Sequence, residues 1–74
     1  MDRITMNPAI CGGKPCIRNT RIMVKNILGM LAGAYTIEQI IVEYPELTKD
    51  DIIASLNYAC RVIDEEKVYF REAV

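Results

Sequence analysis

The 74-residue sequence contains no histidine and no tryptophan, and Ser55 is its only serine. Without an imidazole, the chain lacks the most common general base of enzymes and the most common nitrogen ligand of zinc. The carboxylates of Asp50, Asp51 and residues 64–66 stand at expected helix ends, where the helix dipole and solvent account for them. We therefore expect a protein that is not an enzyme, with no catalytic residues, metal ligands or cofactor.

Cysteines are few, and no two of them form a CxxC pair. An odd number of cysteines without histidine argues against a zinc site or a disulfide framework. Cys60 falls in an apolar helical register and is expected to be a small core residue. Cys11 and Cys16 flank a glycine pair, and two alternatives remain for them: free thiols or a redox pair.

A long apolar run is also missing. The longest such segment, at about residues 27–35, is too short to span a bilayer, and Met1, Asp2 and Arg3 do not begin a signal peptide. We expect a cytoplasmic protein with no membrane partner.

Half of the chain (51%) is apolar, which is more than a domain of this length readily covers. A chain of this size buries roughly 60% of the surface that it exposes when unfolded. Residues 1–74 therefore make one domain, and we expect a homodimer to complete its core.

Charge is divided unevenly along the chain. Residues 26–74 hold nine acids and four cations, whereas residues 1–25 hold one acid and five cations. The five are Arg3, Lys14, Arg18, Arg21 and Lys25. Such a basic end suits a polyanion, but charge alone does not name the partner. If the protein binds DNA, we expect Lys14, Arg18 and Lys25 to supply the phosphate contacts.

Three regions follow from the sequence pattern. Residues 1–24 are expected to form loops and short strands, residues 25–63 three helices, and residues 64–74 a C-terminal extension. The β-favouring runs are too short for a sheet of their own, so we expect a strand pair that a second copy completes.

The first helix is predicted by apolar residues at helical spacing from Val24, with Gly33 as its stop. Thr36 and Gln39 form a capping-box pattern that begins the second helix, which ends before Pro45. Thr48 begins the third helix. Its predicted apolar stripe consists of Ile52, Leu56, Ala59, Cys60 and Ile63.

The second and third helices have the spacing of a helix-turn-helix, although a plain pair of core helices fits the same pattern. The exposed face expected for the third helix holds Asp50, Ser55, Asn57, Tyr58 and Arg61. Of these, Asn57 and Arg61 are suited to reading base edges.

The segment around Gly12 and Gly13 is expected to be a shaped loop, with φ above zero at the glycines and a fixed φ at Pro15. It lacks the GK[ST] pattern of a nucleotide-binding loop. We expect Thr20 and Arg21 to be structural as well. For Arg21 the favoured partner is a carboxylate, Glu43 or Asp51, and the alternative is a phosphate.

The sequence resembles domain-of-unknown-function family 433 from Ile4 to about Cys60. The matching residues are Gly13-Lys14-Pro15, Ile17-Arg18, Thr20-Arg21-Ile22, Val24, Gly33, Tyr44-Pro45-Glu46-Leu47-Thr48 and Ala59. Asn19 stands where the family usually has glycine, but asparagine tolerates the same left-handed turn.

This resemblance implies a mainly α, homeodomain-like helix-turn-helix fold with a short N-terminal β element. It also implies an antitoxin-like component of a prokaryotic type II toxin-antitoxin system, which binds DNA for autoregulation and neutralises a PIN-like ribonuclease toxin. The alternative function is a dimeric protein-interaction or scaffold module without DNA binding.

The C-terminal extension has two interpretations. It either lengthens the third helix within the dimer or binds the toxin. In the second case an apolar-aromatic face meets the toxin groove and a cation approaches its carboxylates, and the residues assigned are Lys67, Tyr69, Phe70 and Arg71.

Overall fold

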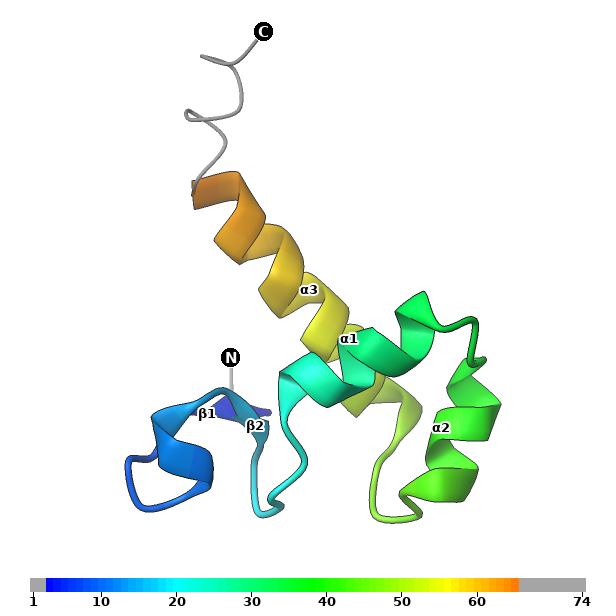
Figure 1. The fold of residues 1–74 in the computed structure, drawn as a ribbon, viewed down its shortest axis with the longest axis horizontal. Coiled ribbons are helices and arrows are strands. Elements are labelled where there is room, and N and C mark those ends of the chain that lie inside the picture. Colours follow the sequence, from blue (N-terminus) through cyan, green and yellow to red (C-terminus); the bar gives the residue numbers. More distant parts are fainter. Residues whose placement is uncertain (1–2, 66–74) are drawn as a thin grey trace, which may run out of the picture.

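The structure, a computed structural model, describes residues 3–65 and is mainly helical with a short β element at the N-terminus (Figure 1). The elements in chain order are β1 (Ile4–Thr5), β2 (Cys16–Ile17), α1 (Val24–Ala32), α2 (Ile37–Glu43) and α3 (Lys49–Glu65). The predicted fold class is confirmed, and α2, its turn and α3 form the helix-turn-helix arrangement. No helix of residues 3–65 is long and apolar enough to cross a membrane.

The β-hairpin pairs β1 with β2 in antiparallel register, with Ile4 opposite Ile17 and Thr5 opposite Cys16. A further bridge joins Cys16 to Met23. The predicted strand pair is therefore present. The expectation that a second copy must supply partners for these strands is wrong, because β2 pairs with β1 on one side and with Met23 on the other, all within the same chain.

The loop between the strands contains the glycine pair, and both glycines are left-handed, with φ of 65° at Gly12 and 84° at Gly13. A Cβ on Gly12 would touch nothing within 4 Å, so backbone conformation rather than space requires glycine there. The shaped loop predicted from the sequence is confirmed.

The turn after β2 is held by Thr20, whose hydroxyl donates to the Ile17 carbonyl at 2.7 Å and accepts from the Ile22 N–H at 3.1 Å. Asn19 has φ 65°, the left-handed conformation that a glycine would adopt. Asparagine therefore keeps this turn, as its tolerance of that region predicts.

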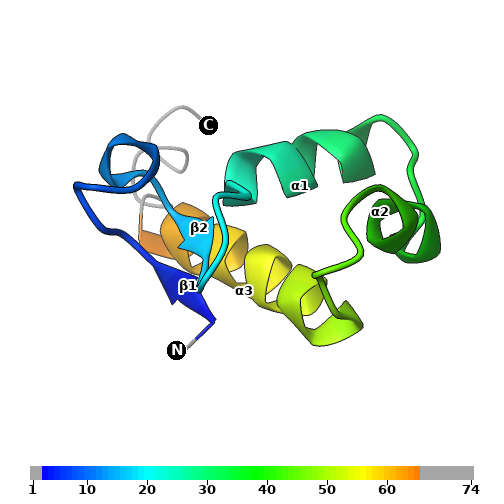
Figure 2. The same cartoon turned by 90° about the horizontal axis from the view of Figure 1, so that it is seen from below.

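The core lies between the three helices and the hairpin. Helices α1 and α3 lie side by side, with the hairpin at one end and α2 at the other (Figure 2). Ile27, Ile40 and Ile52 contribute one fully buried side chain from each helix.

The helix α3 is rotated relative to the predicted apolar stripe. Ser55, expected on the surface, is fully buried and donates its hydroxyl to the Asp51 carbonyl one turn earlier at 3.1 Å. This bond satisfies the hydroxyl and permits its burial. Cys60, expected in the core, is exposed, as are Leu56 and Ile63.

Capping side chains fix where α2 and α3 begin. The predicted box of α2 is confirmed, with Gln39 N–H donating to the Thr36 hydroxyl and Thr36 N–H to the Gln39 side chain. A second box begins α3, where Thr48 N–H donates to the Asp51 carboxylate at 2.9 Å and Asp51 N–H to the Thr48 hydroxyl at 3.2 Å. Helix α2 ends before Pro45, as predicted.

The end of α1 departs from the prediction in one detail. Gly33 is the C-cap, but its φ is −85°, and the left-handed residue is Ala34 with φ 73°. The N–H of Ala34 donates to Leu31 and that of Tyr35 to Met30, which is the Schellman pattern. An alanine thus occupies the position where glycine has no steric penalty.

We predict that Ala34→Gly raises the free energy of unfolding by about 1 kcal/mol, because it relieves the left-handed strain of a residue with a Cβ. Urea unfolding followed by circular dichroism measures it. The control is Gly33→Ala, whose added Cβ would stand 3.5 Å from its nearest neighbours at an ordinary φ, so it should not destabilise the helix. A less stable Ala34→Gly variant would contradict this account of the turn.

Candidate functional site

Four cations of the N-terminal segment form the candidate site. We call Lys14, Arg18, Arg21 and Lys25 the basic loop surface. All four are exposed, and none forms an ion pair with a carboxylate of residues 3–65.

Hydrogen bonds between loops hold this surface together. The N–H of Val24 donates to the Pro15 carbonyl at 2.9 Å, which brings the neighbouring Lys14 and Lys25 to one place. The thiol of Cys11 donates to the Arg21 carbonyl at 3.3 Å. Arg18 lies apart from the two lysines, since its N–H donates to the Arg3 carbonyl at 2.7 Å and places it beside Arg3.

Lys14 and Lys25 line a hollow of about 310 Å³, together with apolar atoms of Val24, Leu28 and Tyr58. Tyr58 comes from α3 and is half-buried, whereas the sequence-based prediction placed it on the exposed face. No signal in the sequence indicated this location, because Ser55, three residues earlier on the same face, was also expected to be exposed. The hollow thus has an apolar floor and two ammonium groups at its rim.

The fifth cation, Arg3, is used within the fold. Its Nη1 lies 2.9 Å from Oδ1 of Asp51, and its Nη2 lies 3.6 Å from Oδ2 of Asp50. The Arg3 side chain is nearly half exposed, while that of Asp51 is mostly buried. Sequence reasoning missed this pair because its members are 48 residues apart.

The carboxylate partner expected for Arg21, Glu43 or Asp51, is not found among residues 3–65, and its structural role stays a prediction. Asp51 is bound by Arg3, which precedes β1 beside the start of α3. Glu43 ends α2 at the far end of the molecule from the hairpin (Figure 2). Arg21 instead stands exposed on the turn before α1, where no carboxylate of the described residues reaches it.

The Asp51 carboxyl has a pKa below its usual value. Burial acts to raise this pKa, but hydrogen bonds from the Thr48 backbone, the Arg3 guanidinium and the Thr48 hydroxyl together outweigh burial. The ionised form is therefore the one that the fold binds.

The two cysteines of the N-terminal segment form no disulfide in the structure and contact each other through a hydrogen bond, so both sequence-based alternatives stay open. Burial, and then a hydrogen bond with Cys11, raises the pKa of Cys16 to about 11. A thiol with this pKa stays protonated at neutral pH and is a poor nucleophile. Within residues 3–65, no group of cysteines and carboxylates is arranged to hold a metal ion.

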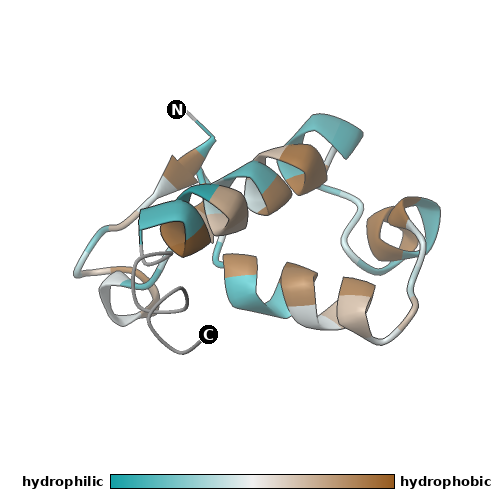
Figure 3. Ribbon diagram, turned by 90° about the horizontal axis from the view of Figure 1, so that it is seen from above, coloured by the Kyte–Doolittle hydropathy of each residue, from teal (hydrophilic) through white to brown (hydrophobic). Residues whose placement is uncertain are grey.

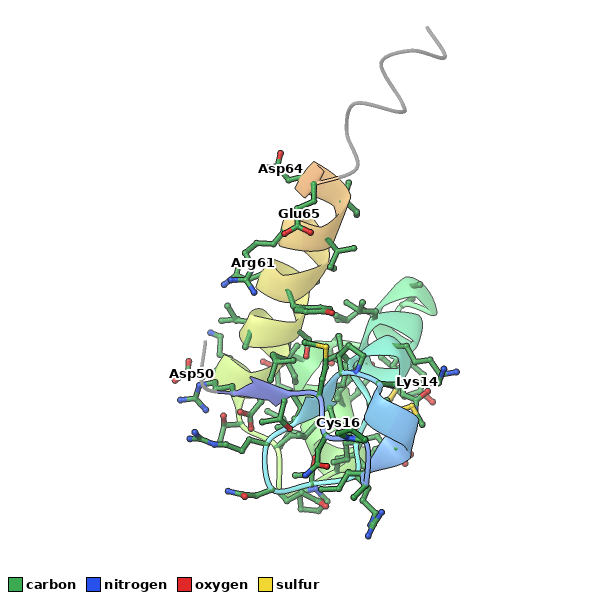
Figure 4. The ribbon with its side chains drawn as sticks, turned by 90° about the vertical axis from the view of Figure 1, so that its left-hand side faces the viewer. Lys14, Cys16, Asp50, Arg61, Asp64 and Glu65 are labelled. Carbon is green, nitrogen blue, oxygen red and sulfur yellow. The ribbon has the colours of Figure 1, made fainter. Side chains whose placement is uncertain are left out.

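The predicted base-reading residues do not join the basic loop surface. Asn57 and Arg61 are exposed one turn apart on α3. Figure 4 shows Lys14 and Arg61 projecting from opposite sides of the molecule. The assignment of Asn57 and Arg61 to bases stays a prediction, and Lys67, Tyr69, Phe70 and Arg71 lie outside the described residues.

Acidic side chains are exposed along α2, in the turn after it and at the start of α3, the part of a helix-turn-helix that usually enters the major groove. The exposed acids there are Glu38, Glu43, Glu46 and Asp50. Because these charges repel phosphate, the basic loop surface is the better candidate for contact with DNA.

These features define a small helix-turn-helix domain with basic N-terminal loops. The chain belongs to the family described as "Protein of unknown function (DUF433)", which matches residues 4–59 and confirms the resemblance seen in the sequence.

Two similar proteins extend the comparison. The fold is similar to the crystal structure of a DUF433 member protein from Anabaena variabilis, with a TM-score of 0.79 and 28% identity, covering 100% of this chain and 71% of that chain. An uncharacterized protein of Sinorhizobium fredii, y4eO, is 30% identical over 56 residues, which are 76% of this chain and 25% of that protein. This chain therefore spans less than half the length of that curated relative.

We predict that Asp51→Asn lowers the free energy of unfolding by about 1 kcal/mol at pH 7, because the helix cap and the partly exposed pair with Arg3 both weaken. The folded-state pKa of Asp51 is depressed, so its contribution is present above the unfolded pKa of about 3.9 and is lost as the pH falls through the folded pKa. Urea unfolding at pH 7 and pH 3 measures the difference.

The matched control is Asp50→Asn, since that carboxylate is exposed and more distant from Arg3. Its effect should be the smaller of the two at pH 7. A difference between wild type and Asp51→Asn that is undiminished at pH 3 would show that the ionised carboxylate is not its source.

Proposed function

We propose that this protein is a cytoplasmic, homodimeric, antitoxin-like regulator without enzymatic activity of its own. It binds DNA through the basic loop surface and neutralises a PIN-like ribonuclease toxin. Membership of the family leaves the function open, so the DNA part of the proposal rests on the charges of the chain, and the antitoxin part on what the resemblance in the sequence implies.

The observation that carries the DNA part is that the four cations of the basic loop surface have no carboxylate partner among residues 3–65. A paired cation such as Arg3 would have to give up its ion pair to bind a phosphate. Unpaired exposed cations need not, and they release counterions from DNA when they bind.

The start of α1 adds to the same surface. Lys25 lies in the first turn of α1, which holds no acidic residue, and Met23 provides no side-chain cap. The positive end of the helix dipole therefore lies near the two lysines, although the Val24 and Asn26 N–H groups already donate to the Pro15 and Met23 carbonyls. The dipole favours a phosphate at this place.

The alternative function, an interaction module without DNA binding, is favoured by a different observation. The exposed acids around α2 and the start of α3 oppose entry of α3 into a DNA groove. In this alternative the acidic surface binds a basic protein, and binding of DNA is weak at every salt concentration.

We predict that Lys14→Ala combined with Lys25→Ala weakens binding to the DNA upstream of the gene and reduces the salt slope by about 2, since each phosphate contact contributes roughly one. Fluorescence anisotropy over a salt series measures this. Lys49→Ala is the matched control, because Lys49 is exposed among the acids at the start of α3. An unchanged slope in the double variant would point to another surface, and no binding by wild type would favour the interaction module.

We predict that truncation after Glu65 abolishes neutralisation of a co-expressed PIN-like ribonuclease from a neighbouring gene, with the helical fold retained. The removed residues include the predicted toxin contacts Lys67, Tyr69, Phe70 and Arg71. Growth rescue measures neutralisation, and circular dichroism checks the fold. A truncated chain that still rescues growth would contradict the assignment of these contacts.

A further inference from the structure

The helix α3 has a second apolar stripe that the core does not use. We call Ile53, Leu56, Cys60 and Ile63 the outer stripe. Ile53 is 39% exposed, Leu56 is 40% exposed and Ile63 is 60% exposed, and Cys60 is exposed as well. Large apolar side chains in such a row are costly in water and usually mark an interface.

The spacing of the outer stripe is that of a helix-pairing seam. Its members follow one another at intervals of three, four and three residues, which is the a/d pattern of paired helices. Ser55, which faces the core, lies on a different face of α3, whereas buried Ile52 stands one turn before Leu56 at the border between the outer stripe and the core. One face of this helix therefore builds the domain, and another has the pattern of a contact with a further helix.

The C-terminal turns of α3 extend beyond the body of the domain (Figure 1). Residues 60–65 are all exposed. Even Val62 is exposed, although it lies two turns after buried Ser55 on the same side of α3. Apolar colouring continues along this projecting part (Figure 3). An exposed helix segment gains little from propensity alone, so packing against another element would stabilise it.

A second copy of the chain fits the outer stripe better than a charged partner does. The stripe contains no charged residue, so it offers no complementarity to an acidic or basic surface. A second α3 supplies the same spacing, and a two-fold axis makes one patch complementary to itself. In the sequence Lys67 takes the next position of this spacing, and apolar residues return at Phe70 and Val74; all three lie outside the described residues.

We propose that the outer stripe is the dimer interface, packed against the same stripe of a second copy. This inference rests on the dimer of the proposed function, but it depends neither on DNA nor on a toxin. It replaces the strand pairing expected from the sequence, because β1 and β2 already pair within the chain.

Leu56→Glu tests the interface, since it places a charge at the centre of the seam. We expect it to weaken dimerisation at least a hundredfold, measured as the mass in solution by light scattering over a concentration series. Circular dichroism should show an unchanged helical fold, because Leu56 is not a core residue. Val42→Glu is the matched control, since Val42 is apolar and 79% exposed but lies on α2.

Cys60→Leu tests the same face in the opposite direction. A larger apolar side chain at a seam position should tighten the dimer several-fold, an effect that loss of folding cannot produce. Sedimentation equilibrium on wild type and variant measures it. No tightening, together with a Leu56→Glu protein that dimerises like wild type, would overturn the interface.

The outcomes separate this inference from the rest of the proposed function. A wild-type chain that is monomeric up to several hundred micromolar overturns both the dimer and the interface. A dimer that Val42→Glu breaks and Leu56→Glu does not overturns the outer stripe alone. A dimer that Leu56→Glu breaks supports the stripe, even if the wild-type protein binds no DNA.

Discussion

The carboxylate of Asp51 joins the start of the described chain to the first turn of α3, because it caps α3 through Thr48 N–H and binds the guanidinium of Arg3 beside β1. Either contact alone is modest, since the Arg3 side chain is nearly half exposed. Together they fix the first turn of α3 against the hairpin. This attachment sets which face of α3 turns inward and therefore which residues remain available at the surface.

The use of Arg3 also separates the N-terminal cations into two groups. One cation is neutralised within the fold, and the basic loop surface keeps its charge for a partner. The distinction does not depend on composition, since all five residues lie in the same segment and all are exposed. Partner contacts are thus better judged from ion pairing than from net charge.

The parts of the fold that were predictable from the sequence are those governed by neighbouring residues. The Thr36 and Gln39 box, the end of α2 before Pro45 and the left-handed Asn19 each depend on contacts within a few residues. The pairing of Arg3 with Asp51 and the position of Tyr58 in the hollow depend on contacts across the chain. No spacing rule predicts such contacts, and the candidate site was for this reason only partly predictable.

The rotation of α3 shows why a helix with two apolar stripes is ambiguous in sequence. Ile52 and Leu56 stand one turn apart, and the apolar pattern alone assigns both to the core. The structure buries Ile52 but exposes Leu56, and it buries Ser55 as well. Ser55 can be buried because its hydroxyl donates to the Asp51 carbonyl and needs no water. A small polar residue in the core leaves the larger apolar residues for the opposite side, where Cys60 and Ile63 continue the row. The apolar surplus of the composition is therefore not spread over the surface of α3. It is concentrated along one line of that helix, and this arrangement suits contact with another helix better than it suits water.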